Sequence, residues 1–274
     1  MLKGLGLYYM RIDDIDNRII GQTSNVLELK RILKDIIDRG ANHNIILIGA
    51  SGMGKSHILK IIANVFKVKN CIAYDPTNFT VDTQKRFHFI DECSIMPEPE
   101  RIYSYLDSRK YTFVLATNEY GSIKESLLNR CISIILEPYT LDDLAELAKL
   151  SLADDGIYLI DNELYKSIAA VGRNNPRRLK QIVLRLSLIF KDTGIPRTVN
   201  ELDYLLMSIG VDSKTGLTRW DRIYLEFLKD IGTASISAIA NSTGIDVDFI
   251  IKYVEPFLLS NGYIKISSRG RTCI

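Results

Sequence analysis

The stretch that decides the fold lies at residues 49–56 and reads Gly49-Ala50-Ser51-Gly52-Met53-Gly54-Lys55-Ser56. An apolar run at 45–48 precedes it, and apolar residues with helical spacing follow at 58–62, so we predict a tight loop between a strand and a helix. Glycines let such a loop turn its N–H groups inward, and the helix N-terminus adds partial positive charge. Lys55 can then reach the outer phosphates of a nucleotide, and Ser56 can ligate Mg²⁺. The sequence predicts a phosphate-binding loop rather than a chance glycine-rich turn.

Composition bounds what this loop can belong to. The chain has 274 residues, of which 46% are hydrophobic and 25% charged, so two or three domains are expected. A net charge of +2 is too small to indicate a nucleic-acid partner by itself. The cysteines are widely spaced and histidines are few, which argues against disulfides or a zinc site. The first ten residues do not read as a signal peptide and no long apolar run follows, so we expect a soluble, reducing, cytoplasmic setting without a membrane.

Acidic and polar residues end two further predicted strands. The apolar run at 87–90 is followed by Asp91 and Glu92, as in a Walker B site. Asp91 can hold Mg²⁺ through its water shell, and Glu92 can deprotonate the water that attacks the γ-phosphate. The strand at 111–115 leads to Asn118, a candidate sensor of the γ-phosphate or the water. The alternative for the acidic pair is an ordinary turn after a strand.

The order of elements predicts three domains. Strands at 71–74 and 132–136 complete a doubly wound α/β domain at 1–138, and a small all-α lid follows at 139–212, in which Asp161 can cap a helix. In the lid, Asn175-Pro176 opens a helix whose basic residues are either a solvated face or include an arginine, Arg177, aimed at the nucleotide. Three helices and a hairpin with a basic turn at 267–271 form a winged helix at 213–274, for duplex DNA or for protein contact. Thr218-x-x-Asp221 caps the first of these helices, and the third runs from about Asp246 to Ser260.

Several stretches together carry a family resemblance. They are Ile20-Gly21-Gln22, residues 49–56, Phe89-Ile90-Asp91-Glu92, Ala116-Thr117-Asn118 with Gly121-Ser122, Asn129-Arg130, Asn175-Pro176-Arg177, Val254-Glu255-Pro256-Phe257-Leu258, Asn261-Gly262-Tyr263-Ile264 and Arg269-Gly270-Arg271. Over nearly its whole length the chain resembles the RuvB family of bacterial Holliday-junction branch-migration ATPases, of the AAA+ class. The resemblance implies an α/β P-loop AAA+ domain, a helical lid, a C-terminal winged helix, and a hexameric ring that pulls duplex DNA or a DNA junction through its pore.

The resemblance also implies roles for individual residues. Arg130 resembles the arginine finger given to the neighbouring subunit, Arg177 the lid sensor and Asn118 the first sensor. Arg130 and Asn118 are expected to join Lys55 and Glu92 in catalysis. Residues expected to bind ATP are Ile19, Ile20, Gly49, Ser51, Gly52, Met53, Gly54, Lys55, Ser56, His57, Pro176 and Arg177, with Ser56 and Asp91 as the Mg²⁺ ligands. Arg269 and Arg271 match the wing arginines that meet the DNA backbone.

Three departures from the family pattern stand out. The family carries a β-hairpin between its Walker B and sensor strands that holds the partner RuvA, whereas little more than one helix, predicted from Glu98 to Asp107, bridges Glu92 and Tyr111. We therefore doubt a RuvA-type partner. The chain stops at Ile274, before the family's usual C-terminus, so we expect a trimmed wing. Asn118 replaces a family threonine and, like Asn129-Arg130-Cys131, is typical of clamp loaders.

Three functions therefore compete. The first is an ATP-driven DNA translocase resembling RuvB, favoured by the C-terminal winged helix. The second is an ATP-dependent loader or switch, like a clamp loader or an initiator, that places another protein on DNA. The third is a regulatory ATPase whose winged helix binds only protein.

Overall fold

The computed structural model describes residues 10–274, so the expectation about a signal peptide falls almost entirely outside it. The chain forms two compact units. One runs up to Asp143 and includes Asn175–Arg177, and the other comprises Leu144–Asn174 and Arg178–Ile274. The finer division into three domains stays a prediction. Among residues 10–274, no helix combines the length and apolar character needed to span a bilayer.

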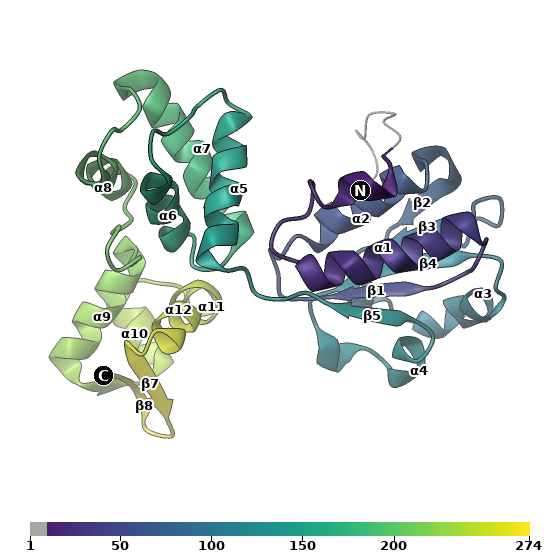
Figure 1. The fold of residues 1–274 in the computed structure, drawn as a ribbon. Coiled ribbons are helices and arrows are strands. Elements are labelled where there is room, and N and C mark those ends of the chain that lie inside the picture. Colours follow the sequence, from purple (N-terminus) through teal and green to yellow (C-terminus); the bar gives the residue numbers. More distant parts are fainter. Residues whose placement is uncertain (1–9) are drawn as a thin grey trace. The chain divides into compact units, whose positions relative to one another are not determined.

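A five-stranded parallel sheet forms the centre of the first unit (Figure 1). Its strand order is β2-β3-β4-β1-β5, with bounds β1 Ile45–Ile48, β2 Cys71–Tyr74, β3 Phe87–Ile90, β4 Thr112–Thr117 and β5 Ile132–Ile135. β1, β3 and β4 are buried along their whole length, as strands covered on both faces are. Because the strands are parallel, the chain leaves β1, β3 and β4 at the same edge, which brings residues 49–56, 91–92 and 118 together.

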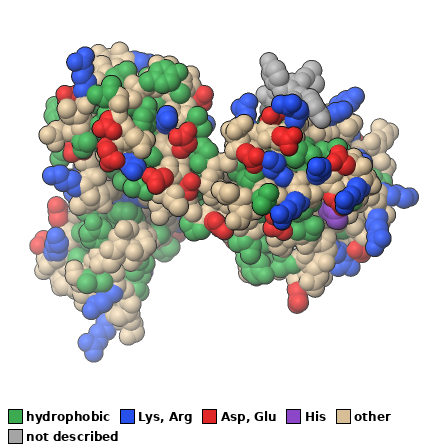
Figure 2. Space-filling model, viewed as in Figure 1, with side chains coloured by type: hydrophobic (Ala, Val, Ile, Leu, Met, Phe, Trp, Pro, Cys, Tyr) green, Lys and Arg blue, Asp and Glu red, His purple; other side chains and the backbone are tan. Residues whose placement is uncertain are grey.

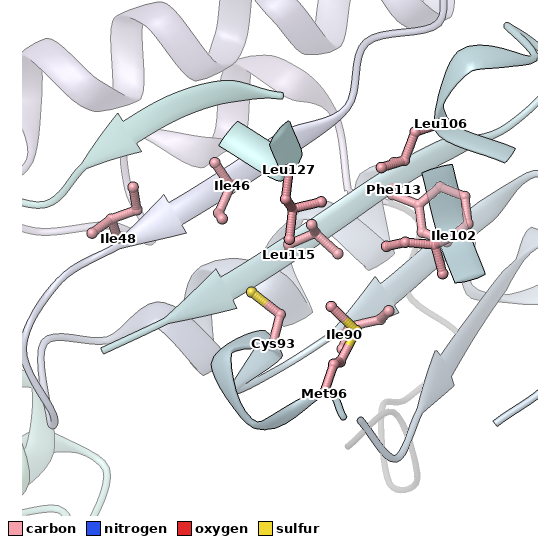
Figure 3. Packing of buried hydrophobic residues seen from close by; sticks show 10 residues of the cluster. All are labelled: Ile46, Ile48, Ile90, Cys93, Met96, Ile102, Leu106, Phe113, Leu115 and Leu127. Atoms are coloured by element: carbon pink, nitrogen blue, oxygen red, sulfur yellow. The ribbon is translucent and has the colours of Figure 1, made fainter. Parts of the chain in front are cut away.

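Helices cover both faces of this sheet. Figure 1 shows α1 (Thr23–Asp38) and α2 (Lys55–Val65) on one face, and α3 (Tyr103–Asp107) and α4 (Glu125–Leu128) on the other. Alternate strand residues turn toward α3 and α4 (Figure 3), where they join a buried cluster of Ile46, Ile48, Ile90, Cys93, Met96, Ile102, Leu106, Phe113, Leu115 and Leu127. The doubly wound α/β fold predicted from the strand order is therefore confirmed.

The segment between β3 and β4 contains only helical elements. Short 3₁₀ helices at Cys93–Ile95 and Pro99–Ile102 lead into α3. We expected one helix from Glu98 to Asp107, but its first turn is 3₁₀ and begins at Pro99, whose fixed φ suits a helix start. The segment contains no pair of strands, in agreement with the expectation that no hairpin arm lies here. Further 3₁₀ turns lie at Ile12–Ile15, Val68–Asn70 and Tyr120–Ser122.

Four helices form the lid: α5 (Leu141–Ala153), α6 (Asn162–Val171), α7 (Pro176–Thr193) and α8 (Val199–Ser208). The Asp161 side chain accepts a hydrogen bond from the N–H of Glu163 and caps α6, as the sequence predicts. Pro176 begins α7, also as predicted.

A winged helix follows the lid. Its helices are α9 (Arg219–Ile231), α10 (Ile236–Thr243), α11 (Val247–Phe249) and α12 (Glu255–Ser260). The strands β6 (Thr233–Ala234), β7 (Ile264–Ser267) and β8 (Gly270–Cys273) form a sheet of order β6-β8-β7. The predicted capping box of Thr218 and Asp221 opens α9. Residues from every helix and from β7 share one apolar core.

The third helix runs over 247–260, close to the predicted span, with a π-helical turn at Ile250–Val254 between α11 and α12. Pro256 explains the π turn, since it has no N–H for an ordinary helical bond. One expectation about the winged helix is wrong, because Arg271 does not lie in the turn. Ser267 pairs with Gly270, so the turn is Ser268-Arg269, and Arg271 lies in β8 opposite Ile266.

Candidate functional site

The loop at 49–56 has the backbone of a phosphate cradle. Gly52 and Gly54 have φ of 88° and 85°, which side chains rarely allow. A Cβ at Gly52 would lie 2.5 Å from Oδ1 of Asn175. Lys55 begins α2 with its side chain folded over the loop, and its Nζ donates to the carbonyl oxygens of Gly49 and Ala50 at 2.6 and 2.9 Å.

Charge around Lys55 fits an anion site. Burial lowers the pKa of its ammonium group, the negative charge of Asp91 opposes that shift, and the positive charge of Arg177 adds to it. Two cationic side chains therefore act on one another at this loop. Phosphate oxygens would relieve that repulsion, which suits a site for a polyanionic ligand.

The predicted Mg²⁺ ligands lie side by side. Ser56 Oγ donates to Oδ2 of Asp91 at 2.6 Å, which joins the start of α2 to the end of β3. Glu92 follows with φ of 54°, a left-handed conformation that is uncommon for a residue with a side chain. Its N–H donates to Oδ1 of Asp91 at 3.1 Å, and its own side chain is exposed. Such local strain is typical of functional sites.

Asn118 lies at the carboxyl edge of the sheet with its side chain exposed. The preceding Thr117 is fully buried, and its Oγ1 accepts a hydrogen bond from the N–H of Glu119 at 3.1 Å. This turn at the end of β4 brings Asn118 out beside the strand that precedes the phosphate loop.

Three more of the residues expected to bind ATP, Ile19, Ile20 and His57, lie in or near α2. Ile19 is buried and Ile20 half-buried, and Nε2 of His57 lies 3.0 Å from the carbonyl oxygen of Arg18. Sequence reasoning missed Tyr139, whose hydroxyl donates to the carbonyl of Met53 at 3.3 Å. No local signal marks Tyr139, because the contact joins the phosphate loop to a residue far along the chain.

The turn at 175–177 reaches the same loop. Oδ1 of Asn175 accepts from the N–H of Arg177 at 3.0 Å, which fixes the first turn of α7 beyond Pro176. Nη1 of Arg177 lies 3.3 Å from Oγ of Ser51. The structure therefore places Arg177 beside the phosphate loop, and its contact with a nucleotide stays a prediction.

Arg130 is held within its own chain, away from residues 49–56. Its Nε donates to both carboxylate oxygens of Asp107 at 3.0 and 3.1 Å, and its Nη1 donates to the carbonyl of Ser126 at 2.7 Å. The guanidinium also lies 4.6 Å from the centre of the Tyr103 ring. Arg130 therefore lies apart from the phosphate loop and its acidic partners, and its role as an arginine finger stays a prediction.

The wing carries the predicted DNA-binding arginines in different settings. Arg269 is exposed in the turn between β7 and β8, and Figure 2 shows basic side chains at this end of the winged helix. Arg271 instead pairs with Glu255, whose side chain is 5% exposed, through Nε to Oε1 at 2.8 Å. The Tyr224 hydroxyl donates to the same oxygen at 2.8 Å. Contact of both arginines with the DNA backbone stays a prediction, and Arg271 is already bonded inside the domain.

A buried ion pair joins the lid to the winged helix, and sequence reasoning missed it. Arg173 bonds to Asp221 and to the carbonyl of Gly216, and its guanidinium stacks 3.5 Å from the centre of the Phe257 ring. The side chains of Arg173 and Asp221 are 6% and 1% exposed. Asp221 was predicted only as a helix cap, and nothing local indicates its distant partner.

Known proteins that are similar to this chain have the same family in common. The family model described as RuvB C-terminal winged helix domain matches residues 214–273. RuvB of Kosmotoga olearia is 26% identical, over 95% of this chain and 85% of that protein, and RuvB of Orientia tsutsugamushi is 28% identical, over 93% and 89%. The chain is RuvB-like. The family resemblance seen in the sequence is thereby confirmed.

Solved structures agree on the fold of this RuvB-like chain. The Thermotoga maritima RuvB Holliday junction branch migration motor matches with a TM-score of 0.75 at 23% identity, over 96% of this chain and 94% of that one. Domain III of the T. maritima replication initiation protein DnaA matches with a TM-score of 0.53 at 18% identity, over 70% of this chain. At these identities the matches concern the fold alone, and the RuvB match extends further along the chain.

Proposed function

We propose that this chain is an ATP-driven DNA motor that works as a hexameric ring and moves duplex DNA at recombination junctions. One observation carries the proposal: a phosphate loop with its acidic partners and a RuvB-type winged helix occur in a single RuvB-like chain. The first supports ATP turnover, and the second supports work on DNA. The named relatives are RuvB subunits of Holliday junction branch migration complexes.

The residues at the sheet edge fit Mg²⁺-ATP. Gly52 and Gly54 hold the loop in left-handed conformations suited to a phosphate cradle, and Ser56 and Asp91 offer adjacent oxygen ligands of the kind Mg²⁺ prefers. When bound, Mg²⁺ would neutralise charge on the phosphate oxygens. Lys55 would hold the outer phosphates, and Glu92 would accept a proton from the attacking water. Arg130 would stabilise transition-state charge at the neighbouring subunit's nucleotide.

The wing would supply phosphate contacts on DNA. We assign this contact to Arg269, which is exposed at the turn. The bonds of Arg271 to Glu255 favour a structural role for it. We further propose that the chain uses no RuvA-type partner docked between β3 and β4, because helices fill that segment.

Loader and regulatory functions have less support. The features that favoured a loader were Asn118 and the Asn129-Arg130-Cys131 motif, which are local. The winged helix and the relatives that span most of the chain favour a motor.

Turnover of ATP with and without duplex DNA, and with no second protein, tests the proposal. The unmodified chain should hydrolyse ATP faster when duplex is present. Lys55→Ala should abolish ATP binding because Lys55 touches phosphate in the ground state, whereas Glu92→Gln should retain binding and stop hydrolysis. Turnover that duplex DNA does not raise would contradict the motor, and equal loss of binding in both variants would contradict the two roles.

A further inference from the structure

Asn44 is a buried polar side chain at the entrance to β1, and it lies in contact with the loop that carries Arg130. It is 8% exposed. Its Nδ2 donates to the carbonyl oxygens of Leu106 and Arg130, both at 3.2 Å, and its Oδ1 accepts from the N–H of Phe113 at 3.1 Å. These partners come from three segments, each of which is distant from Asn44 in sequence. One amide therefore ties the end of α3, the start of β4 and the Arg130 loop together.

The main chain of Asn44 strengthens the same junction. Its carbonyl accepts from the N–H of Ile132 at 2.7 Å, so Asn44 is bonded on both sides of Cys131. The side chain of Arg130 is held by the same segment, because its partner Asp107 directly follows Leu106, whose carbonyl bonds to Asn44. Backbone and guanidinium of Arg130 are thus both held by groups that Asn44 connects.

We propose that Asn44 is the positioning residue of the arginine finger. The proposal rests on the role of Arg130 proposed above. A finger stabilises charge only where it is presented in a fixed geometry, and an error of about 1 Å can cost about 100-fold in rate. Among the residues that the structure describes, the hydrogen bonds of the Arg130 guanidinium use Nε and Nη1, and none uses Nη2. Asn44 thus fixes the loop that carries Arg130, and Nη2 of Arg130 is the atom that would reach a second copy of this chain.

Asn44→Asp tests this with little change in shape. It keeps the acceptor for Phe113 and replaces two donations with repulsion between oxygens. Because Arg130 acts in the transition state, we expect ATP affinity within about twofold of normal and kcat reduced about 10-fold to 100-fold. Asn42→Asp is the matched control. Asn42 lies on the same loop, but its Nδ2 donates to the carbonyl of Arg109, so kcat should stay within about twofold.

Mixing subunits separates positioning from general damage. An Asn44→Asp subunit has an intact Glu92 and a misplaced finger, whereas a Glu92→Gln subunit has an intact finger. Mixtures of the two should therefore turn over ATP faster than either alone. In a double variant with Arg130→Ala, the change at Asn44 should add no further loss of kcat, because the group it positions is already gone.

The outcomes distinguish this inference from the function on which it rests. If Arg130→Ala leaves kcat intact, the finger assignment itself is wrong. If Arg130→Ala is inactive while Asn44→Asp matches Asn42→Asp, the finger stands and the role of Asn44 is overturned. Losses that multiply in the double variant would also overturn it. Should Asn44→Asp fail to fold, Asn44→Gln, which moves the amide out by one methylene, answers the same question with the same measurements.

Discussion

Arg271→Leu should unfold the winged helix more easily rather than simply weaken DNA binding. The change removes the cation from a pair in which the Glu255 side chain is 5% exposed and the Arg271 side chain 19% exposed. Glu255 would keep only the Tyr224 hydroxyl. Removing one partner of a buried ion pair lowers the free energy of unfolding by about 3–5 kcal/mol. Because water can reach part of this site, we expect the free energy of unfolding to fall by about 2–4 kcal/mol.

The chain supplies its own probe for this measurement. Its single tryptophan, Trp220, lies in α9 of the winged helix, 6.0 Å from Phe249 between ring centres. Urea unfolding followed by Trp220 fluorescence therefore reports on this domain. With a denaturant slope of about 1–3 kcal/mol per M, the urea midpoint should fall by about 0.7–4 M. Arg269→Leu is the matched control, because its side chain is exposed in the turn, and it should change stability by less than about 0.5 kcal/mol.

For DNA binding, we expect the larger effect from Arg269→Leu and the smaller effect from Arg271→Leu. Arg269→Leu should lower the slope of log affinity against log salt by about one phosphate contact, and Arg271→Leu should lower it less. The reasoning fails if Arg271→Leu matches Arg269→Leu in urea and alone flattens the salt dependence, because Arg271 would then face DNA.

Three further predictions follow from buried contacts. Arg173→Met should leave Asp221 as an unpaired buried charge and lower the Trp220-reported stability by about 3–5 kcal/mol, with an unchanged urea midpoint counting against the ion pair. Burial lowers the pKa of His88, so the unfolded chain binds a proton before the folded chain does as the pH falls below about 6.5. The free energy of unfolding, measured by urea titration with circular dichroism, should therefore fall toward pH 5 by up to about 1.4 kcal/mol per pH unit. His88→Phe should remove this part of the pH dependence. Tyr139→Phe should weaken ATP affinity by no more than about tenfold in a fluorescent-nucleotide titration, since one neutral hydrogen bond contributes about 1 kcal/mol, and a larger loss would give its hydroxyl a second role.

The sequence by itself determined the features that depend on neighbouring residues. The phosphate loop between β1 and α2, the acids after β3 and the caps of α6 and α9 all lie where local patterns predict them. Apolar periodicity and strand order were enough for the doubly wound sheet, because each element buries a face that its own residues define.

Tertiary structure decided which partner each polar side chain takes. Arg271 was predicted in a turn with Arg269, yet the ladder of β7 and β8 places it opposite Ile266 and beside Glu255. Asn44 and Tyr139 gave no signal, since their partners lie far along the chain. Burial removes water as the alternative partner, so such groups must bond to whatever the packed elements bring near, and sequence spacing does not encode those distances.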